Sequence, residues 1–119
     1  KLTKPVGVSQ TNTLINRYKQ SAKIRGFLFN LTLDEFNILI KGNCFYCGSL
    51  PSNVLNTKGS DYTLVYNGID RIDSTLGYEV NNCVSCCEWC NYAKRDKPQK
   101  EFLNHIYKMA NSLKERGMI

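Results

Sequence analysis

Several residue types and sequence features are scarce or absent in this chain. Its 119 residues include only three prolines and eight glycines, which excludes a collagen-like chain. No apolar run approaches the roughly 18 residues that a membrane-spanning helix needs. No signal-peptide pattern opens the sequence, so we expect an intracellular protein and not a secreted one. The length excludes a multidomain assembly, and a hydrophobic share of 42% argues against disorder.

Acidic residues are also few, and their placement is uneven. Lys and Arg total 16 against 10 Asp and Glu, and no acid precedes Asp34. Asp70 and Asp73 stand between a basic N-terminal segment and a second basic cluster that begins at Lys94. A solvated surface would explain this pattern, but two basic clusters flanking an acidic centre favour a phosphate-backbone ligand. The candidate contacts to nucleic acid are Arg17, Lys19, Lys23, Arg25, Lys94 and Arg95.

Six cysteines are many for a chain of this size. Cys44 and Cys47 form one C-x-x-C pair, and a later cluster offers two more, Cys83/Cys86 and Cys87/Cys90. Two C-x-x-C turns from distant parts of a chain are the usual four-thiolate zinc arrangement. A disulfide framework is the alternative, but the adjacent residues Cys86 and Cys87 suit ordinary bridges poorly.

The second pair of zinc ligands is expected to be Cys87 and Cys90, because they lead directly into a helix-like run. We therefore predict a structural zinc site made by Cys44, Cys47, Cys87 and Cys90, with Cys83 and Cys86 as core thiols. We call each metal-binding C-x-x-C turn a knuckle. Trp89 is expected to pack around the zinc, and Phe45 and Tyr46 to cover the first knuckle, although an exposed aromatic ring there would be able to stack on a base.

The hydrophobic pattern predicts a small α+β domain. Gly26 is a good stop for a first helix, and Thr32 and Glu35 form a capping box for a second. The predicted elements are an extended arm over 1–10, helices over 12–25 and 32–42, a loop over 48–61, strands over 62–66, 68–73 and 80–86, a helix over 87–96, and a last helix from Pro98 whose apolar stripe is Phe102, Ile106, Met109, Ala110 and Leu113. Residues 1–40 would form a basic arm and two leader helices, and residues 41–119 a zinc-knuckle module of the same domain.

One stretch carries a family resemblance. It comprises Asn67-Gly-Ile-Asp-Arg-Ile-Asp73, Leu76-Gly-Tyr78, Asn81-Asn82 and Cys87-Glu-Trp-Cys-Asn-Tyr-Ala-Lys-Arg95. In this stretch the chain resembles the HNH endonucleases, above all the small zinc-containing HNH proteins of phages and other viral genomes and the recombination endonuclease VII type. The resemblance covers about residues 40–104. It implies a ββα-metal core pinned by zinc knuckles and flanked by N-terminal and C-terminal helices.

The same resemblance implies a catalytic site. Asp70 and Arg71 occupy the place of the family's Asp-His pair, Asn82 (or Asn81) that of the Asn that fixes the hairpin loop, and Asn91 that of the last metal ligand. Asp70 and Asn91 would then hold one Mg²⁺ or Mn²⁺, since hard oxygen ligands suit these ions. Zinc would stay structural, because four thiolates leave no open coordination position.

Arg71 is the main departure from the family pattern. The family's His acts as the general base, and a guanidinium does not lose its proton near neutral pH. Arg71 would instead grip a phosphate, with Asp73 or Tyr78 standing in for the base. His105, the only histidine, is expected to be a surface or packing residue on the last helix.

The resemblance therefore predicts a metal-dependent DNA endonuclease or nickase that acts on double-stranded DNA. The main alternative is a non-catalytic zinc module of the same fold that binds nucleic acid or a protein partner. A third reading is a structural zinc protein of a viral or organellar assembly whose basic surface meets RNA.

Overall fold

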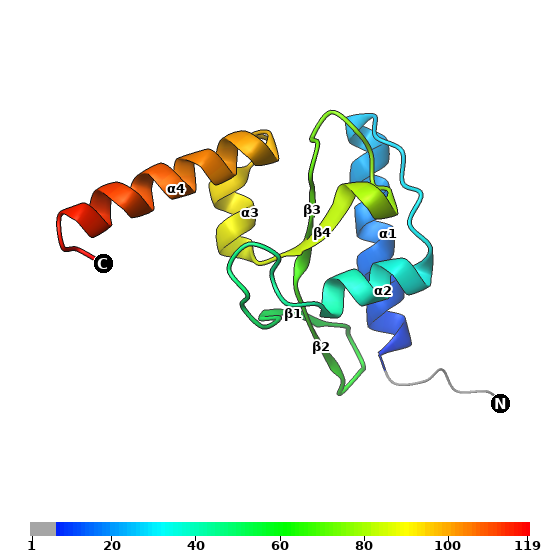
Figure 1. Cartoon of the computed structure of the whole chain (residues 1–119). Coiled ribbons are helices and arrows are strands. Elements are labelled where there is room, and N and C mark those ends of the chain that lie inside the picture. Colours follow the sequence, from blue (N-terminus) through cyan, green and yellow to red (C-terminus); the bar gives the residue numbers. More distant parts are fainter. Residues whose placement is uncertain (1–6) are drawn as a thin grey trace.

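A computed structural model describes residues 7–119 as a small α+β protein (Figure 1). Its elements are α1 (Val8–Arg25), α2 (Leu33–Lys41), β1 (Asn53–Asn56), β2 (Thr63–Tyr66), β3 (Gly68–Arg71), the short 3-10 helix η1 (Val80–Asn82), β4 (Cys83–Cys86), α3 (Glu88–Lys94) and α4 (Gln99–Glu115). Strands β1 and β2 form one antiparallel sheet, and β3 and β4 form a second. The predicted α+β class is confirmed.

Local signals set the boundary between α1 and α2. Gly26 ends α1 with a left-handed φ of 80°, and its N–H donates to carbonyls of the last turn. Thr32 and Glu35 form the predicted capping box of α2, with hydrogen bonds of 2.9 and 3.1 Å. These ends depend on neighbouring residues alone, which is why the sequence predicts them.

The start of α1 is set by a contact from far along the chain. The helix begins at Val8, earlier than the predicted residue 12, so the extended arm is wrong for residues 8–10, while residues 1–6 lie outside the described part. Gln10 is buried, and its Nε2 donates to Thr57 Oγ1 at 2.8 Å and to Ser60 Oγ at 3.0 Å. The loop between β1 and β2 therefore fixes the first turn of α1.

The two hairpins differ from the predicted strands. β1 lies inside the segment 48–61 that the sequence assigned to a loop, and Leu55 on β1 pairs with Leu64 on β2. In the second hairpin the register runs from Gly68 opposite Cys86 to Arg71 opposite Cys83. The predicted strands 68–73 and 80–86 are thus too long. A braced turn follows Arg71, and η1 precedes β4.

The core lies where α1 and α2 pack against the hairpins. Figure 1 shows these helices beside β3 and β4. Phe36 and Ile40 of α2 and Leu64 of β2 are fully buried, and Ala22 of α1 joins them. Tyr78, which follows the β3–β4 turn, exchanges backbone hydrogen bonds with Leu28 and Asn30, so the segment after α1 is attached to the hairpin.

Helix α4 projects from this core (Figure 1), and the protein measures 64 × 31 × 20 Å. Of the predicted apolar stripe, Phe102 alone is buried, whereas Ile106 and Met109 are exposed. Beyond Phe102 the core does not cover the stripe, because the helix continues past the body of the protein. Within the described residues, no helix has the length and apolar character needed to cross a membrane.

Candidate functional site

Four cysteines form a compact cluster at one end of the β3–β4 hairpin. The sulfur atoms of Cys44, Cys47, Cys87 and Cys90 all lie within 4.8 Å of one another. Those of Cys47 and Cys87 are 3.6 Å apart. Four sulfurs bound tetrahedrally at about 2.3 Å would be about 3.8 Å apart, so the cluster has the dimensions and the soft ligands of a structural zinc site. The structure therefore brings together the four cysteines that the spacing selected.

Backbone turns position both knuckles. In the first, Gly48 N–H donates to the Cys44 carbonyl, and Cys44 N–H donates to the Ser49 carbonyl. In the second, Cys87 is the N-cap of α3, and its sulfur accepts a hydrogen bond from the Cys90 N–H at 3.4 Å. Each pair of sulfurs is thereby aimed at one point.

The six thiols differ in acidity, and the difference does not follow the division between cluster and core, because burial raises the pKa of Cys87 and Cys90 as well. The Ser49 hydroxyl, 3.0 Å from the Cys47 sulfur, lowers the pKa of Cys47 to about 6 and so favours the thiolate that a metal needs. Burial raises the pKa of Cys83 to about 11 and also raises the pKa of Cys86. Cys83 packs in the main core and Cys86 beneath the cluster, which agrees with their prediction as core thiols.

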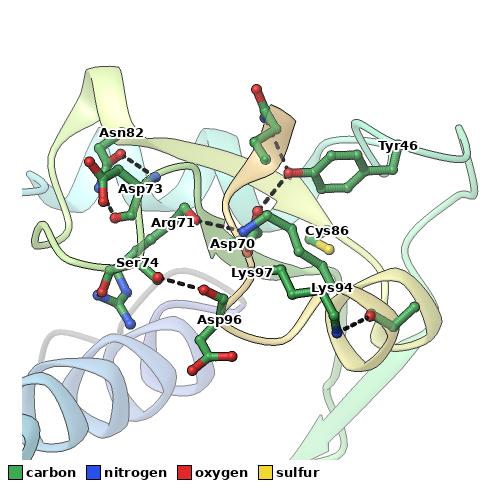
Figure 2. Close-up of polar contacts among 12 residues, drawn as sticks. Tyr46, Asp70, Arg71, Asp73, Ser74, Asn82, Cys86, Lys94, Asp96 and Lys97 are labelled. Carbon is green, nitrogen blue, oxygen red and sulfur yellow. Dashed lines mark hydrogen bonds and ion pairs between the residues drawn. The ribbon is translucent and has the colours of Figure 1, made fainter. Parts of the chain in front are cut away.

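Asp70 is already occupied by two partners from the protein (Figure 2). Lys94 Nζ lies 3.2 Å from Asp70 Oδ1, and the Tyr46 hydroxyl donates to Asp70 Oδ2 at 2.7 Å. The Asp70 and Lys94 side chains are 4% and 0% exposed. Gln99 Nε2 in turn donates to the Tyr46 oxygen at 3.2 Å. This network links the first knuckle, β3, α3 and the start of α4.

One expectation about this region is corrected. Lys94 is not a surface contact for nucleic acid, because it points inward and also donates to the Arg71 carbonyl at 3.1 Å. Helical spacing had placed Lys94 beside Arg95, but a lysine that pairs with a buried carboxylate lies on the inner face. Lys94 and Tyr46 contact the two oxygens of Asp70, so the role of Asp70 as a metal ligand stays a prediction that would require it to change partners.

The Arg71 side chain is held by contacts within the protein. Its Nη1 donates to the carbonyls of Ser74 and Leu76, both at 2.7 Å, and its guanidinium carbon lies 3.8 Å from the centre of the Phe27 ring. The side chain is buried, so the predicted phosphate grip is not available to Nη1. Tyr78, proposed as a base, is buried under the same guanidinium.

Asn82 braces the loop between β3 and β4, as the resemblance implied. Its Nδ2 donates to the Asp73 and Gly77 carbonyls at 3.1 and 2.9 Å, and its Oδ1 accepts from the Asp73 N–H at 2.9 Å. Figure 2 shows Asn82 beside Asp73. Asn81 is exposed. The Asp73 carboxylate accepts hydrogen bonds from Thr75, which lower its pKa. Asp73 therefore stabilises the turn, and its carboxylate accepts these hydrogen bonds more strongly when it is ionised than when it is protonated.

A cleft of about 810 Å³ lies between α1 and α3, over the β3–β4 hairpin. Arginines line both of its walls: Arg17 and Arg25 from α1, and Arg95, the C-cap residue of α3. Asp70 and Asn91 also line it, and Asn91 is exposed. The acids Glu88 and Asp96 lie at the same cleft, so its lining carries both signs of charge.

Two of the four basic residues that the sequence predicts as nucleic-acid contacts on α1 lie outside the cleft. Lys19 and Lys23 do not line the cleft among the described residues, and Lys19 Nζ lies 5.9 Å from the centre of the Phe29 ring. Arg17, Ser21 and Arg25 line it together because they are four residues apart, which places them on one face of a helix. His105 is exposed on α4, as expected, and does not line the cleft either.

Sequence reasoning missed Tyr46 and Gln99 as partners of the Asp70 network. It also missed Phe27 and Tyr78 as the rings that hold Arg71. A signal existed for Tyr46, since a residue inside a knuckle is held close to the hairpin. No local pattern marks Gln99 or Phe27, because their contacts form only in the folded chain.

These features define a small α+β protein with a four-cysteine cluster that can hold a metal ion. Over 98 residues the chain is 36% identical to a protein of Acanthamoeba polyphaga mimivirus, R423, whose name describes it as uncharacterized. The aligned region covers 82% of this chain and 16% of that viral protein, so the chain spans only a small part of its relative. No family model matches the chain, and no solved structure matches it.

We expect the purified protein to hold one zinc ion per chain, and Cys47→Ser to lose it. Structural zinc contributes about 10–16 kcal/mol of apparent free energy, as much as or more than the typical stability of a domain of about 5–15 kcal/mol. The loss should therefore unfold much of the chain. Zinc released by a thiol reagent, with helicity from circular dichroism, measures both effects. Cys83→Ala is the matched control and should retain zinc. Equal zinc in both variants, or an intact fold after chelation, would contradict the site.

Proposed function

We propose that this chain is a zinc-stabilised, HNH-like module that binds the phosphodiester backbone of nucleic acid in the cleft between α1 and α3. The observation that carries the proposal is the placement of Arg17 and Arg25 on one wall and Arg95 on the other. Cations from two helices around one cleft suit a chain of phosphates, and the net charge of +6 favours its approach. The viral relative fits the small viral HNH proteins that the sequence resembles.

The arrangement of elements supports the HNH-like part of the proposal. β3 and β4 form an antiparallel hairpin, α3 follows directly, and the four-cysteine cluster lies at the start of that helix. Asn82 braces the hairpin loop, and Asp70 and Asn91 line one cleft. This order of elements supports the proposal of a ββα-metal core.

Binding is favoured over hydrolysis because the side chains that would do chemistry are already engaged. Asp70 is in a buried ion pair, and Arg71 holds the turn. Removing one partner of a buried ion pair typically costs about 3–5 kcal/mol, so Asp70 stabilises the fold as long as Lys94 stays in place.

We expect binding to DNA to weaken with salt and to depend on the cleft arginines. Arg17→Ala or Arg95→Ala should each lower the slope of log affinity against log salt by about one, since each removes one phosphate contact. Fluorescence anisotropy of a labelled oligonucleotide across a salt series gives the slope. Lys23→Ala is the matched control, being an exposed cation of α1 outside the cleft. An equal fall of the slope in Lys23→Ala would show that binding depends on the total positive charge of the protein and not on the cleft.

Hydrolysis is the second candidate, favoured by the presence of Asp70 and Asn91 in the same cleft. An Mg²⁺ or Mn²⁺ ion held there would stabilise the charge of the phosphodiester transition state and its leaving oxygen. Asp70 would have to release Lys94 to become a ligand. Asn91 is the cleaner residue to test, because it is exposed and supports no buried pair.

If the chain cuts DNA, plasmid nicking should require Mg²⁺ or Mn²⁺ and should fall at least about tenfold in Asn91→Ala, with binding retained. Supercoiled plasmid on an agarose gel measures nicking, and anisotropy measures binding. Wild-type protein that binds DNA without nicking it would eliminate this second candidate and leave the binding function in place.

A further inference from the structure

Aromatic side chains are exposed around the metal cluster. Trp89 is 88% exposed, Tyr92 is 72% exposed and Phe45 is 58% exposed. The expectation that Trp89 packs around the zinc is wrong, because its position between Cys87 and Cys90 on the first turn of α3 turns it to the outside. Large aromatic rings left in water are costly, at about 25 cal/mol for each Å² of apolar surface. A set of them at one place is therefore a candidate contact surface.

These rings adjoin the basic cleft. Trp89 and Tyr92 are three residues apart on α3 and so are neighbours on the helix surface. Tyr92 lines the cleft together with Arg95, whose guanidinium carbon lies 5.0 Å from the centre of the Tyr92 ring. The aromatic surface is thus continuous with one of the cationic walls.

The backbone that carries these rings is held in place by the knuckles. Phe45 lies between Cys44 and Cys47, just as Trp89 lies between Cys87 and Cys90. One face of Phe45 is also supported, since its ring meets that of Tyr46 edge-on at 5.2 Å, and Tyr46 is hydrogen-bonded to Asp70. Rigid aromatic groups lose little conformational entropy when they bind a ligand.

We infer that Trp89 and Tyr92 form a stacking platform for unpaired bases, and that the ligand of the cleft is single-stranded nucleic acid. This inference rests on the proposed nucleic-acid function and narrows its substrate from the duplex that the sequence suggested. The flat faces of bases are covered in a duplex and open in a single strand. Stacking a base on an aromatic side chain contributes about 1–3 kcal/mol, whatever the base.

The charge around the platform selects this occupant. A partner protein with an apolar surface would bury the rings but would leave the cleft arginines without anions. A single strand supplies both components: a base for Trp89 or Tyr92, and a phosphate for Arg95 or Arg17. Its flexible backbone can also enter a concave site between two helices.

Trp89 is the only tryptophan in the chain, so its fluorescence reports directly on the platform. We expect oligo(dT) or oligo(U) to quench this emission on binding, because stacking on a base quenches the indole, whereas a DNA duplex of equal length should quench it little. The midpoints of titrations with oligo(dU) and oligo(U), which differ only in the sugar, identify the preferred sugar. Quenching by duplex equal to that by both single strands would overturn the inference.

Substitutions test the platform independently of the reporter. Trp89→Leu and Tyr92→Leu should each weaken single-strand binding by about tenfold in anisotropy, and leave the weaker duplex binding almost unchanged. Trp89→Phe should retain most of the affinity, because it keeps an aromatic face. Tyr107→Leu is the matched control, an exposed aromatic residue on α4. Zinc content and helicity verify that each variant is folded.

The outcomes separate the two proposals. Unchanged single-strand affinity in folded Trp89→Leu and Tyr92→Leu overturns the stacking inference, and leaves the backbone-binding function standing. Failure of wild-type protein to bind any single strand or duplex at low salt overturns both.

Discussion

Two chain segments 40 residues apart meet at the four-cysteine cluster, and the remaining architecture of the site depends on that junction. The knuckle at Cys87 begins α3, so the cluster sets where that helix starts and which face it turns toward β3. Only then can Lys94 reach Asp70, and only then does Arg95 stand across the cleft from α1. A small domain buries a limited core, so a metal that links distant segments replaces packing that the chain cannot supply.

The charged residues around the β3–β4 hairpin have two different roles. Asp70 and Lys94 face inward and connect β3 to α3, while Arg17, Arg25 and Arg95 face a common cleft. A buried ion pair is kept in place by the cost of leaving either partner alone, so the Asp70 network fixes the geometry of the site. The cleft arginines remain available to a ligand. This division of charge is the reason we propose a binding module rather than a nuclease centre with a free carboxylate.

How far the sequence predicts this structure depends on the range of the interactions. The capping box at Thr32, the stop at Gly26 and the C-x-x-C turns are local, and the sequence predicts them correctly. The inward turn of Lys94, the exposure of Trp89 and the projection of α4 depend on which faces meet in the folded chain. The same spacing that groups Lys94 with Arg95 is compatible with either an outer or an inner position. The burial of the Asp70 carboxylate, which no sequence pattern reveals, decides between the two positions of Lys94.

The most direct measurement of the central claim is an amide NMR map of the zinc-loaded protein titrated with oligo(dT). The account predicts that the largest shifts fall on the face of α1 that carries Arg17, Ser21 and Arg25, and on α3 from Glu88 to Arg95. It also predicts that α4 beyond Phe102 shifts little, because α4 extends from α3 on the side away from α1 (Figure 1). Shifts confined to α4, or spread evenly over all basic residues, would contradict the assignment of the cleft as the nucleic-acid site.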